Sequence, residues 1–317
     1  MAGGRRLGGA AAAAALLLLP AALAAQTYTR GENVAPAFEG WEQNPDGSFN
    51  LVFGYMNRNW LEEPDVAVGE DNFFSPGPQD RGQPTRFLPR RNRFVFKVLV
   101  PADFGDQELV WTLTSNGKTE QAYGSLRPDY VVDHMIVASE TGSLGAGTST
   151  PESRANVAPV ITLMADETHH VSVGQPLTLV ARVEDDGLPR STRRVSPADT
   201  SDAPRLLSAA QLRPPVRITV GKVNGLHLSW FVYRGEGDVR FDPPQVKVWE
   251  DTRTGMNSPW APLWRPPPVP EDGTYEVRVT FDRPGTYVLR ARADDGGLLH
   301  DREVTVVVRP VTAPDLE

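Results

Sequence analysis

The sequence has no cysteine among its 317 residues. This absence excludes disulfides, thiolate metal sites, iron–sulfur clusters, cysteine nucleophiles and a lipid-modified cysteine at a mature N-terminus. Positive charge is also in deficit, because 32 Lys and Arg face 40 Asp and Glu and the formal net charge is −8. Binding to nucleic acid depends on neutralising phosphates, so this charge balance argues against a nucleic-acid partner.

Motifs typical of several enzyme classes are missing as well. The adjacent pair His169-His170 would point to opposite faces of a strand, so the two rings cannot bind one metal from it. There is no His-Glu-x-x-His, no Gly-x-Ser-x-Gly and no phosphate-binding glycine loop. The spacing of Ser115 and Lys118 fits Ser-x-x-Lys, but an Asn-Gly turn accounts for it. We expect a protein that is not an enzyme; a glycoside hydrolase with an unrecognised carboxylate pair is the remaining enzymatic alternative.

The N-terminal segment has the features of a secretory signal peptide. Two arginines precede an apolar run at 10–19, and Ala22-Leu23-Ala24 supplies the small residues of a cleavage site. We therefore predict a cleaved signal peptide over 1–25, with an uncleaved anchor as the alternative. The run is shorter than the roughly 20 residues that span a bilayer, and no later run approaches that length. The mature chain is expected to be exported, in the periplasm or at the cell surface and extracellular space, without an integral membrane span.

What the chain does contain is a period of two in its apolar residues, broken by 28 glycines and 29 prolines. Such alternation predicts strands that are buried on one face, and frequent Gly and Pro predict turns between them. Asn116-Gly117 follows one alternating run directly and is a strong hairpin signal. An all-β fold is therefore predicted, with strands at 49–56, 93–100, 109–113, 177–183, 226–232, 274–281, 287–291 and 304–308.

One break in composition divides the chain. Residues 139–156 are rich in Ser, Thr, Gly, Glu and Pro and contain almost nothing to bury, so they are predicted to be a flexible linker. An aromatic-rich module at 34–138 precedes it and a second module at 157–310 follows. Two inserts, near 188–215 and 252–272, interrupt the second module. We expect two tandem β-sandwich domains.

The second module carries motifs found in immunoglobulin-type sandwiches. Trp230 and two apolar residues, Leu179 and Leu289, occupy the places of the strand-C tryptophan and its two packing partners. The segment 282–287 (DRPGTY) has the form of a tyrosine corner, and Asn156-Val157-Ala158-Pro159 opens the module. Together these resemble the PKD-like and related Ig-like domains of bacterial surface proteins. The block at 87–113 is similar to an uncharacterised group of exported bacterial proteins.

The resemblance implies an exported, non-catalytic binding or scaffolding protein of the bacterial envelope. Sandwiches of this kind hold loops and sheet edges at fixed positions, where a partner can meet them. The partner would be an envelope protein or an envelope polysaccharide. A carbohydrate-binding protein that uses exposed tryptophans is the first alternative, and the hydrolase named above is the second.

Two Asp-Asp-Gly turns are candidate metal ligands. Calcium takes about six to eight oxygen ligands, and paired carboxylates in loops at one end of a sandwich would supply some of them. Some PKD-like domains bind calcium, so the resemblance adds to this structural-calcium hypothesis; no other cofactor is expected. The alternative is that Asp and Gly simply form tight turns. The residues concerned are Asp185, Asp186, Asp294 and Asp295.

Aromatic residues outside the clean alternation are candidates for exposure. Flat aromatic rings beside amides and arginine are typical of sugar-binding faces, whereas alternating aromatics usually form the core. We therefore select Trp60 and Phe73-Phe74 as exposed candidates, and Trp260 with Trp264 in the proline-rich insert as a second set. The predicted ligand-binding residues are Asn57, Arg58, Trp60, Trp260 and Trp264.

A run of basic residues follows an acidic stretch in the first module. It is either a basic patch for an acidic polymer or one half of charge pairing across neighbouring strands. Charge pairing is the favoured interpretation, because the module has a net negative charge. The basic residues are Arg81, Arg86, Arg90, Arg91, Arg93 and Lys97.

Overall fold

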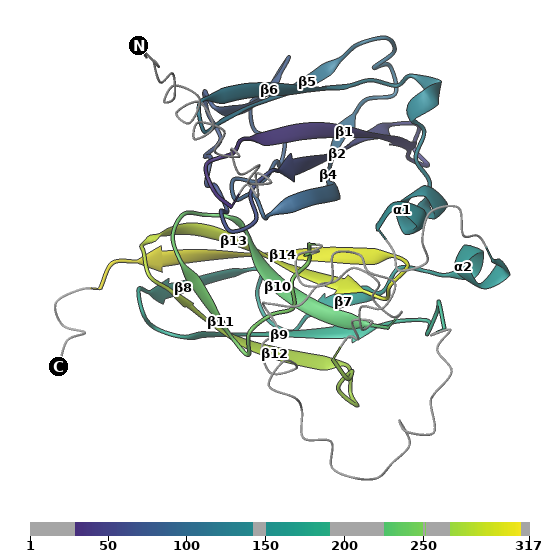
Figure 1. Cartoon of the computed structure of the whole chain (residues 1–317). Coiled ribbons are helices and arrows are strands. Elements are labelled where there is room, and N and C mark those ends of the chain that lie inside the picture. Colours follow the sequence, from purple (N-terminus) through teal and green to yellow (C-terminus); the bar gives the residue numbers. More distant parts are fainter. Residues whose placement is uncertain (1–28, 142–149, 191–224, 250, 252–266, 312–317) are drawn as a thin grey trace, which may run out of the picture.

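The computed structural model describes residues 29–141, 150–190, 225–249, 251 and 267–311. Strands dominate these residues, and the helices among them are short. The strands form two β-sandwiches stacked on one another (Figure 1), which we call the first sandwich (β1–β6) and the second sandwich (β7–β14). The predicted all-β class is confirmed.

The first sandwich pairs two three-stranded antiparallel sheets. One has the order β1-β2-β4 and the other the order β3-β5-β6. In immunoglobulin lettering these are strands A-B-E and C-F-G, the division that defines the Ig sandwich. The strands are β1 (Val34–Gln43), β2 (Phe49–Asn57), β3 (Asn72–Ser75), β4 (Arg90–Val100), β5 (Leu109–Ser115) and β6 (Lys118–Gly124).

Aromatic rings fill the space between these two sheets. Phe53 and Phe96 stack with their centroids 5.6 Å apart, and Phe74 stacks on Trp111 at 5.8 Å. Trp111 is completely buried, and its indole N–H donates to Asn72 over 2.9 Å. Phe74 is 1% exposed, so the prediction that it lies on the surface is wrong; its neighbour Phe73 points out of the sheet and is half-buried. Successive side chains of a strand point to opposite faces, so only one of two adjacent rings can enter the core.

A bulge interrupts β4, and there the predicted alternation fails. Phe53 on β2 pairs with Phe96, but two residues later Tyr55 pairs with Asn92. The extra residues turn the chain, and Phe94 takes a φ of 50° there. As a result Val95, and not Phe94, is the buried residue at this point of the strand. The alternation of the predicted strand at 93–100 would put Phe94 and Phe96 on one face, and it therefore fails at this bulge. The bulge also points the Val95 carbonyl toward the second sandwich, as described below.

The second sandwich has the complete Ig strand order. One sheet is β11-β12-β9-β7, equivalent to D-E-B-A, and the other is β10-β13-β14-β8, equivalent to C-F-G-A′. In this second sheet β8 pairs with β14 in parallel. The strands are β7 (Val160–Leu163), β8 (Thr168–Ser172), β9 (Leu177–Glu184), β10 (His227–Arg234), β11 (Val239–Asp242), β12 (Thr274–Phe281), β13 (Gly285–Asp294) and β14 (Leu299–Arg309).

The core of the second sandwich contains the three residues selected from the sequence. Leu179, Trp230 and Leu289 are at most 2% exposed and belong to one apolar cluster. The tyrosine corner is also present, because the Tyr287 hydroxyl lies 3.0 Å from the Arg283 carbonyl oxygen and 2.6 Å from that of Glu236. Gly235 passes under this ring, where a Cβ would stand 2.4 Å from it. Both predictions are confirmed.

The segment between the sandwiches is more structured than its composition predicts. After the short helix η1 (Pro128–Tyr130), helix α1 (His134–Thr141) packs near β4, and α2 (Pro151–Ala155) follows. A capping box between Thr150 and Ser153 starts α2, and Ser153 and Asn156 are buried. Among the described residues, no helix is long and apolar enough to cross a membrane. Most of both predicted inserts lies outside the described residues.

The tyrosine corner gives a stability prediction with an internal control. Tyr287→Phe removes a hydroxyl that bonds two carbonyls, and we expect it to lower the free energy of unfolding by about 1–3 kcal/mol. Tyr275→Phe removes a buried hydroxyl that has no hydrogen-bond partner in the described structure. That variant should be as stable as the wild type or more stable. Urea unfolding of both variants tests this, and equal losses would contradict the assignment.

Candidate functional site

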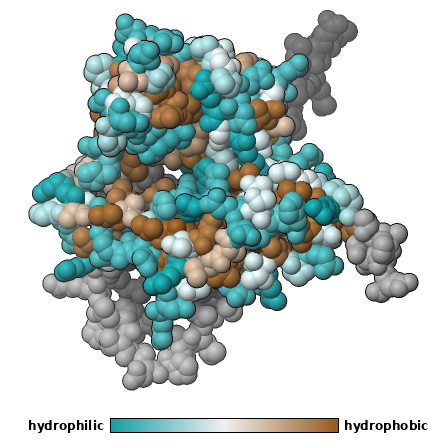
Figure 2. Space-filling model, turned by 180° about the vertical axis from the view of Figure 1, so that it is seen from behind, coloured by the Kyte–Doolittle hydropathy of each residue, from teal (hydrophilic) through white to brown (hydrophobic). Residues whose placement is uncertain are grey.

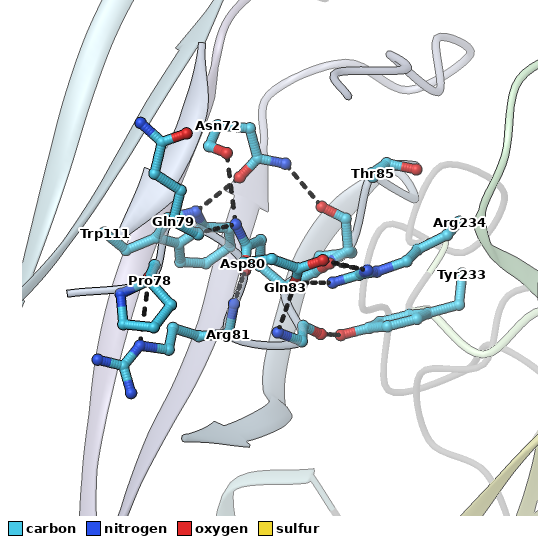
Figure 3. A network of polar contacts seen from close by, with 12 residues as sticks. Asn72, Pro78, Gln79, Asp80, Arg81, Gln83, Thr85, Trp111, Tyr233 and Arg234 are labelled. Carbon is cyan, nitrogen blue, oxygen red and sulfur yellow. Dashed lines mark hydrogen bonds and ion pairs between the residues drawn. The ribbon is translucent and has the colours of Figure 1, made fainter. Parts of the chain in front are cut away.

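The two sandwiches meet along a polar contact that we call the seam. From the first sandwich it contains the loop between β3 and β4 and the β4 bulge, and from the second it contains the end of β10 and the middle of β13 (Figures 1 and 3). Seen from behind, the hydrophobic residues form separate patches on the two sandwiches, with hydrophilic residues between them (Figure 2). The seam residues are Asp80, Gly82, Gln83, Thr85, Arg86, Val95, Tyr233, Arg234, Gly235, Gly237 and Arg290.

The end of β10 binds the β3–β4 loop through two consecutive side chains (Figure 3). The Arg234 guanidinium forms two hydrogen bonds with Asp80, at 2.7 and 3.0 Å, and donates to the Gln83 carbonyl at 2.8 Å. The Tyr233 hydroxyl donates to the Gly82 carbonyl at 2.6 Å. Such bidentate, charge-assisted pairing fixes orientation as well as distance.

Backbone groups and Arg86 extend the same contact. The amides of Thr85 and Arg86 both donate to the Tyr233 carbonyl, and the Gly235 amide donates to the Thr85 hydroxyl. The Arg86 guanidinium holds Asp65 with two hydrogen bonds and reaches the Gly237 carbonyl at 2.8 Å. Backbone as well as side-chain hydrogen bonds therefore join the loop to the second sandwich.

The loop itself is held in shape by buried amides. Asn72 donates to the carbonyls of Val66 and Pro84, and its oxygen accepts the Trp111 indole N–H. Gln83, which is completely buried, donates to the Gln79 carbonyl and accepts from the Arg81 amide. These contacts present Asp80 and Gly82 to the second sandwich in a fixed conformation (Figure 3).

Arg290 lies at the centre of the seam. Its guanidinium stacks 3.4 Å from the centroid of the Tyr233 ring and donates to the Val95 carbonyl at 2.6 Å. Glu303 and Asp301 on β14 pair with the same guanidinium. Burial raises the pKa of Tyr233 to about 12 although Arg290 opposes the shift. Tyr233 packs within the core cluster of the first sandwich, so the second sandwich contributes a residue to that core.

Four of the six residues in the basic run of the first sandwich are ion-paired, which is what the charge-pairing interpretation predicts, and the other two contact backbone carbonyls or a ring. Arg86 pairs with Asp65, Arg93 with Glu140 and Lys97 with Glu42. Arg81 donates to the carbonyls of Pro76 and Pro78. Arg90 lies 4.2 Å from the centroid of the Trp60 ring, and Arg91 pairs with Glu39. A basic patch for an acidic polymer therefore finds no support here.

The pair of Arg91 with Glu39 crosses over the middle strand of its sheet. Arg91 is on β4 and Glu39 on β1, and Gly54 of β2 lies between them. A Cβ on Gly54 would stand 2.2 Å from a Glu39 carboxylate oxygen, so glycine is what leaves room for the pair. Burial raises the pKa of Glu39, although Arg91 at 2.7 Å opposes the shift.

Two of the three ligand-binding residues predicted at 57–60 are at least partly buried in the fold. Asn57 is completely buried, and its amide donates to the carbonyls of Glu62 and Phe87, so its prediction as part of an exposed face is wrong. Arg58 is exposed. Trp60 is half-buried, with Arg90 over its ring and the Trp249 ring 6.4 Å away. Ligand binding by Arg58 and Trp60 stays a prediction, and Trp260 and Trp264 lie outside the described residues.

The two Asp-Asp-Gly turns lie at one end of the second sandwich and hold the chain that enters it. Asp295 accepts from the amides of Gly297 and Leu298 and from the side chain of Asn156. Asp186 accepts from the amides of Val157 and Leu188. The remaining two carboxylates, of Asp185 and Asp294, each accept the amide of the glycine two residues on. Every carboxylate thus has the turn-forming role of the alternative interpretation.

The calcium hypothesis stays a prediction. In the part of the chain that the structure describes, no three His, Asp or Glu side chains are grouped so as to hold a metal. Two buried oxygens at this end nevertheless lack a hydrogen-bond partner, one on Asp185 and the amide oxygen of Asn156. Both are hard donors of the kind that calcium accepts. A calcium ion bound at either turn would contribute by neutralising negative charge on these carboxylates.

Comparisons with known proteins identify no family. No family model matches the sequence, and no curated protein matches it significantly. Among solved structures the chain is similar to the titin domains Z1Z2 in complex with telethonin (10% identity, 87% of this chain, 91% of that chain, TM-score 0.23). It is also similar to domains 4 and 5 of the S-layer protein SbsC (9% identity, 87% of this chain, 98% of that chain, TM-score 0.22). A third similar structure is the D00-D0 domain of intimin (10% identity, 87% of this chain, 100% of that chain, TM-score 0.22). TM-scores this low carry no argument, so the Ig-like fold rests on the strand order described above.

The seam residues were not selected from the sequence. Tyr233 and Arg234 follow the core strand 226–232 directly, where an aromatic and an arginine usually mark only the end of a strand. One signal was available in the alternation of the two strands. Phe231 and Tyr233 point to the face opposite the core residue Trp230, and on β13 Arg290 and Arg292 point to the face opposite the core residue Leu289. A sandwich with large aromatics and arginines on its outer face has a second surface to cover.

Asp295 gives a pH prediction. Burial raises its pKa from 3.8 to about 6, so the folded protein binds a proton that the unfolded chain has already lost. The stability from this proton is complete below pH 4 and is lost as the pH rises through 6. Asp295→Asn should therefore gain up to about 3 kcal/mol relative to the wild type between pH 4 and pH 7.

Urea unfolding at pH 4, 5, 6 and 7 measures this difference. Asp272→Asn is the control, since the pKa of this exposed carboxyl is lowered by its hydrogen bonds to Thr274 and no gain is expected. A difference between wild type and Asp295→Asn that does not change with pH would contradict the assignment.

The calcium hypothesis is tested by thermal melting. If calcium binds at the two turns, adding it should raise the melting temperature of the wild type. Asp185→Ala combined with Asp294→Ala should abolish that rise, because both turns would lose a carboxylate. The double variant of the exposed pair Asp242→Ala and Arg278→Ala is the control and should keep the rise. A rise that survives in the Asp185→Ala, Asp294→Ala variant would exclude these turns as the site.

Proposed function

We propose that this chain is an exported, non-catalytic structural protein of the bacterial cell envelope, in which the two sandwiches act as one rigid unit. The observation that carries the proposal is the seam, where Tyr233 enters the first core and Arg234 and Arg290 bind loop and bulge carbonyls. A pair of modules that only needed to be tethered would not require such contacts. A fixed angle between them is useful where the protein sets a distance or presents surfaces in a defined arrangement.

The placement in the envelope is supported by the sequence. The pattern at 1–25 is that of a signal peptide, and a chain without cysteine does not depend on the redox state of its compartment. The resemblance to PKD-like and Ig-like domains of surface proteins points the same way. The partner we propose is an envelope protein or polysaccharide.

The use of the buried acidic groups supports a non-catalytic role. Asp301 pairs with Arg292 and Arg290, and Glu39 pairs with Arg91. Asp251 pairs with Lys247 over 2.7 Å, and Asp295 accepts two backbone amides. Carboxylates committed in this way stabilise the fold and are not placed as the acid and base of a glycosidase.

Rigidity of the unit is measurable because the chain has no native thiol. Spin labels introduced at Lys118→Cys on the first sandwich and Thr178→Cys on the second would report the distance between them by double electron–electron resonance. Both positions are exposed. We expect a single narrow distribution in this labelled protein.

The seam variant is Tyr233→Ala with Arg290→Ala, which removes the inserted ring and the buried guanidinium together. It should at least double the width of the distribution, while each sandwich keeps its own unfolding transition. Asp242→Ala with Arg278→Ala breaks an ion pair inside the second sandwich and should leave the width unchanged. A distribution in the wild-type background as broad as that of the seam variant would overturn the proposal of a rigid unit.

A further inference from the structure

The outer face of the β3-β5-β6 sheet is a regular surface that takes no part in the seam. It belongs to the sheet of the first sandwich that lies farther from the second one (Figure 1). Because Phe74, Trp111, Leu113 and Ala122 point into the core, the residues that alternate with them point outward. The outer-face residues are Phe73, Ser75, Val110, Thr112, Thr114, Thr119, Gln121 and Tyr123.

Their register makes a grid of two full rows. Phe73, Thr112 and Gln121 lie side by side across the three strands, and so do Ser75, Val110 and Tyr123. Thr114 and Thr119 complete the grid beside the hairpin. Each row therefore has an aromatic ring at one end, on β3 in the first row and on β6 in the second.

Hydrogen bonds hold the polar members of this face in place. The Tyr123 hydroxyl donates to the Gln121 oxygen at 2.7 Å, and the Gln121 amide donates to the Thr112 hydroxyl at 3.0 Å. The hydroxyls of Thr114 and Thr119 lie 2.9 Å apart. These side chains are ordered before any ligand arrives, so little conformational entropy is lost on binding.

None of the eight positions carries a charge, although charged residues make up 23% of the chain. Tyr123 is 52% exposed, and Ser75, Thr119 and Gln121 are exposed as well. Hydroxyls and an amide supply both donors and acceptors, and the aromatic rings supply flat apolar area. The face has no charge to attract an anionic polymer. Of the residues that are enriched in protein interfaces it has the two aromatic rings but no arginine and no methionine.

We propose that this face binds an uncharged polysaccharide in extended form. The C–H faces of the sugars would stack on Tyr123 and Phe73, and their hydroxyls would bond Gln121, Thr114 and Thr119, whereas the buried Thr112 would only hold Gln121 in place. The site differs from the tryptophans selected from the sequence, and it does not depend on the seam. If the test of this site failed, the proposal of a rigid unit would still stand. If the two sandwiches proved not to be rigid, the proposal of this site would still stand.

Native gel electrophoresis through gels that contain a neutral polysaccharide tests the proposal. The probes are hydroxyethyl cellulose and a neutral mannan, with anionic alginate in a third gel. The wild-type protein should be retarded by at least one neutral probe, and this retardation should persist in 0.5 M salt. Salt at this concentration shortens the Debye length to about 4 Å and screens charge attraction, but no charge takes part in this binding. Tyr123→Ala should weaken binding by about tenfold or more.

Gln121→Glu puts a charge into the face without a change of shape, and it should cause a similar loss. The matched controls are Tyr130→Ala, an exposed tyrosine outside this sheet, and Gln175→Glu, on a turn of the second sandwich. Both should bind within about twofold of the wild type. Thermal melts of all variants establish that they are folded.

Three results would overturn the proposal. One is the absence of retardation in both neutral gels. Another is retardation only by alginate that salt removes, which would assign binding to charged groups elsewhere. The third is retardation by a neutral polysaccharide that Tyr123→Ala and Gln121→Glu leave unchanged, which would place the glycan on another surface.

Discussion

The arrangement of the two sandwiches depends on one buried guanidinium. Arg290 is 5% exposed, and a charge so far removed from water is stable only if its donors are satisfied. The second sandwich supplies the carboxylates of Glu303 and Asp301 and the face of Tyr233, but the hydrogen bond to the Val95 carbonyl comes from the first sandwich. Separating the sandwiches would leave this donor unpaired or force the side chain to turn toward water. The contact is therefore specific as well as stabilising.

The first sandwich is adapted to this requirement. A regular β4 would point the Val95 carbonyl along the plane of its own sheet, and the bulge at 92–96 points it outward. The loop between β3 and β4 meets Arg234 only because Asn72 and the buried Gln83 fix its course. The shared interface thus consists of a local irregularity and of buried amides. In an isolated strand or core the same features would be destabilising.

The sequence predicts those features that follow from a repeating pattern. Alternation located eight of the described strands but missed β1, although that strand is ten residues long. Asn116-Gly117 located a hairpin in which both residues have positive φ, and the DRPGTY segment located the tyrosine corner. It failed where one residue departs from the repeat, as at Phe94 in the bulge, and where a short strand hides which ring points inward, as at Phe74. The seam was missed because it joins residues about 150 positions apart, such as Asp80 and Arg234, whose proximity depends on how two finished sandwiches pack.

The same reasoning separates the two kinds of surface on the first sandwich. On the β1-β2-β4 sheet, charges on the outer face are neutralised in pairs, and Gly54 is kept small so that Glu39 can reach Arg91. On the β3-β5-β6 sheet, the outer face has hydroxyls, an amide and two rings, and no charge to neutralise. Paired charges keep a surface soluble without offering a binding site, since each partner is already occupied. An ordered uncharged grid with an exposed ring keeps free donors, acceptors and apolar area together, and this is why the binding site is assigned to that sheet.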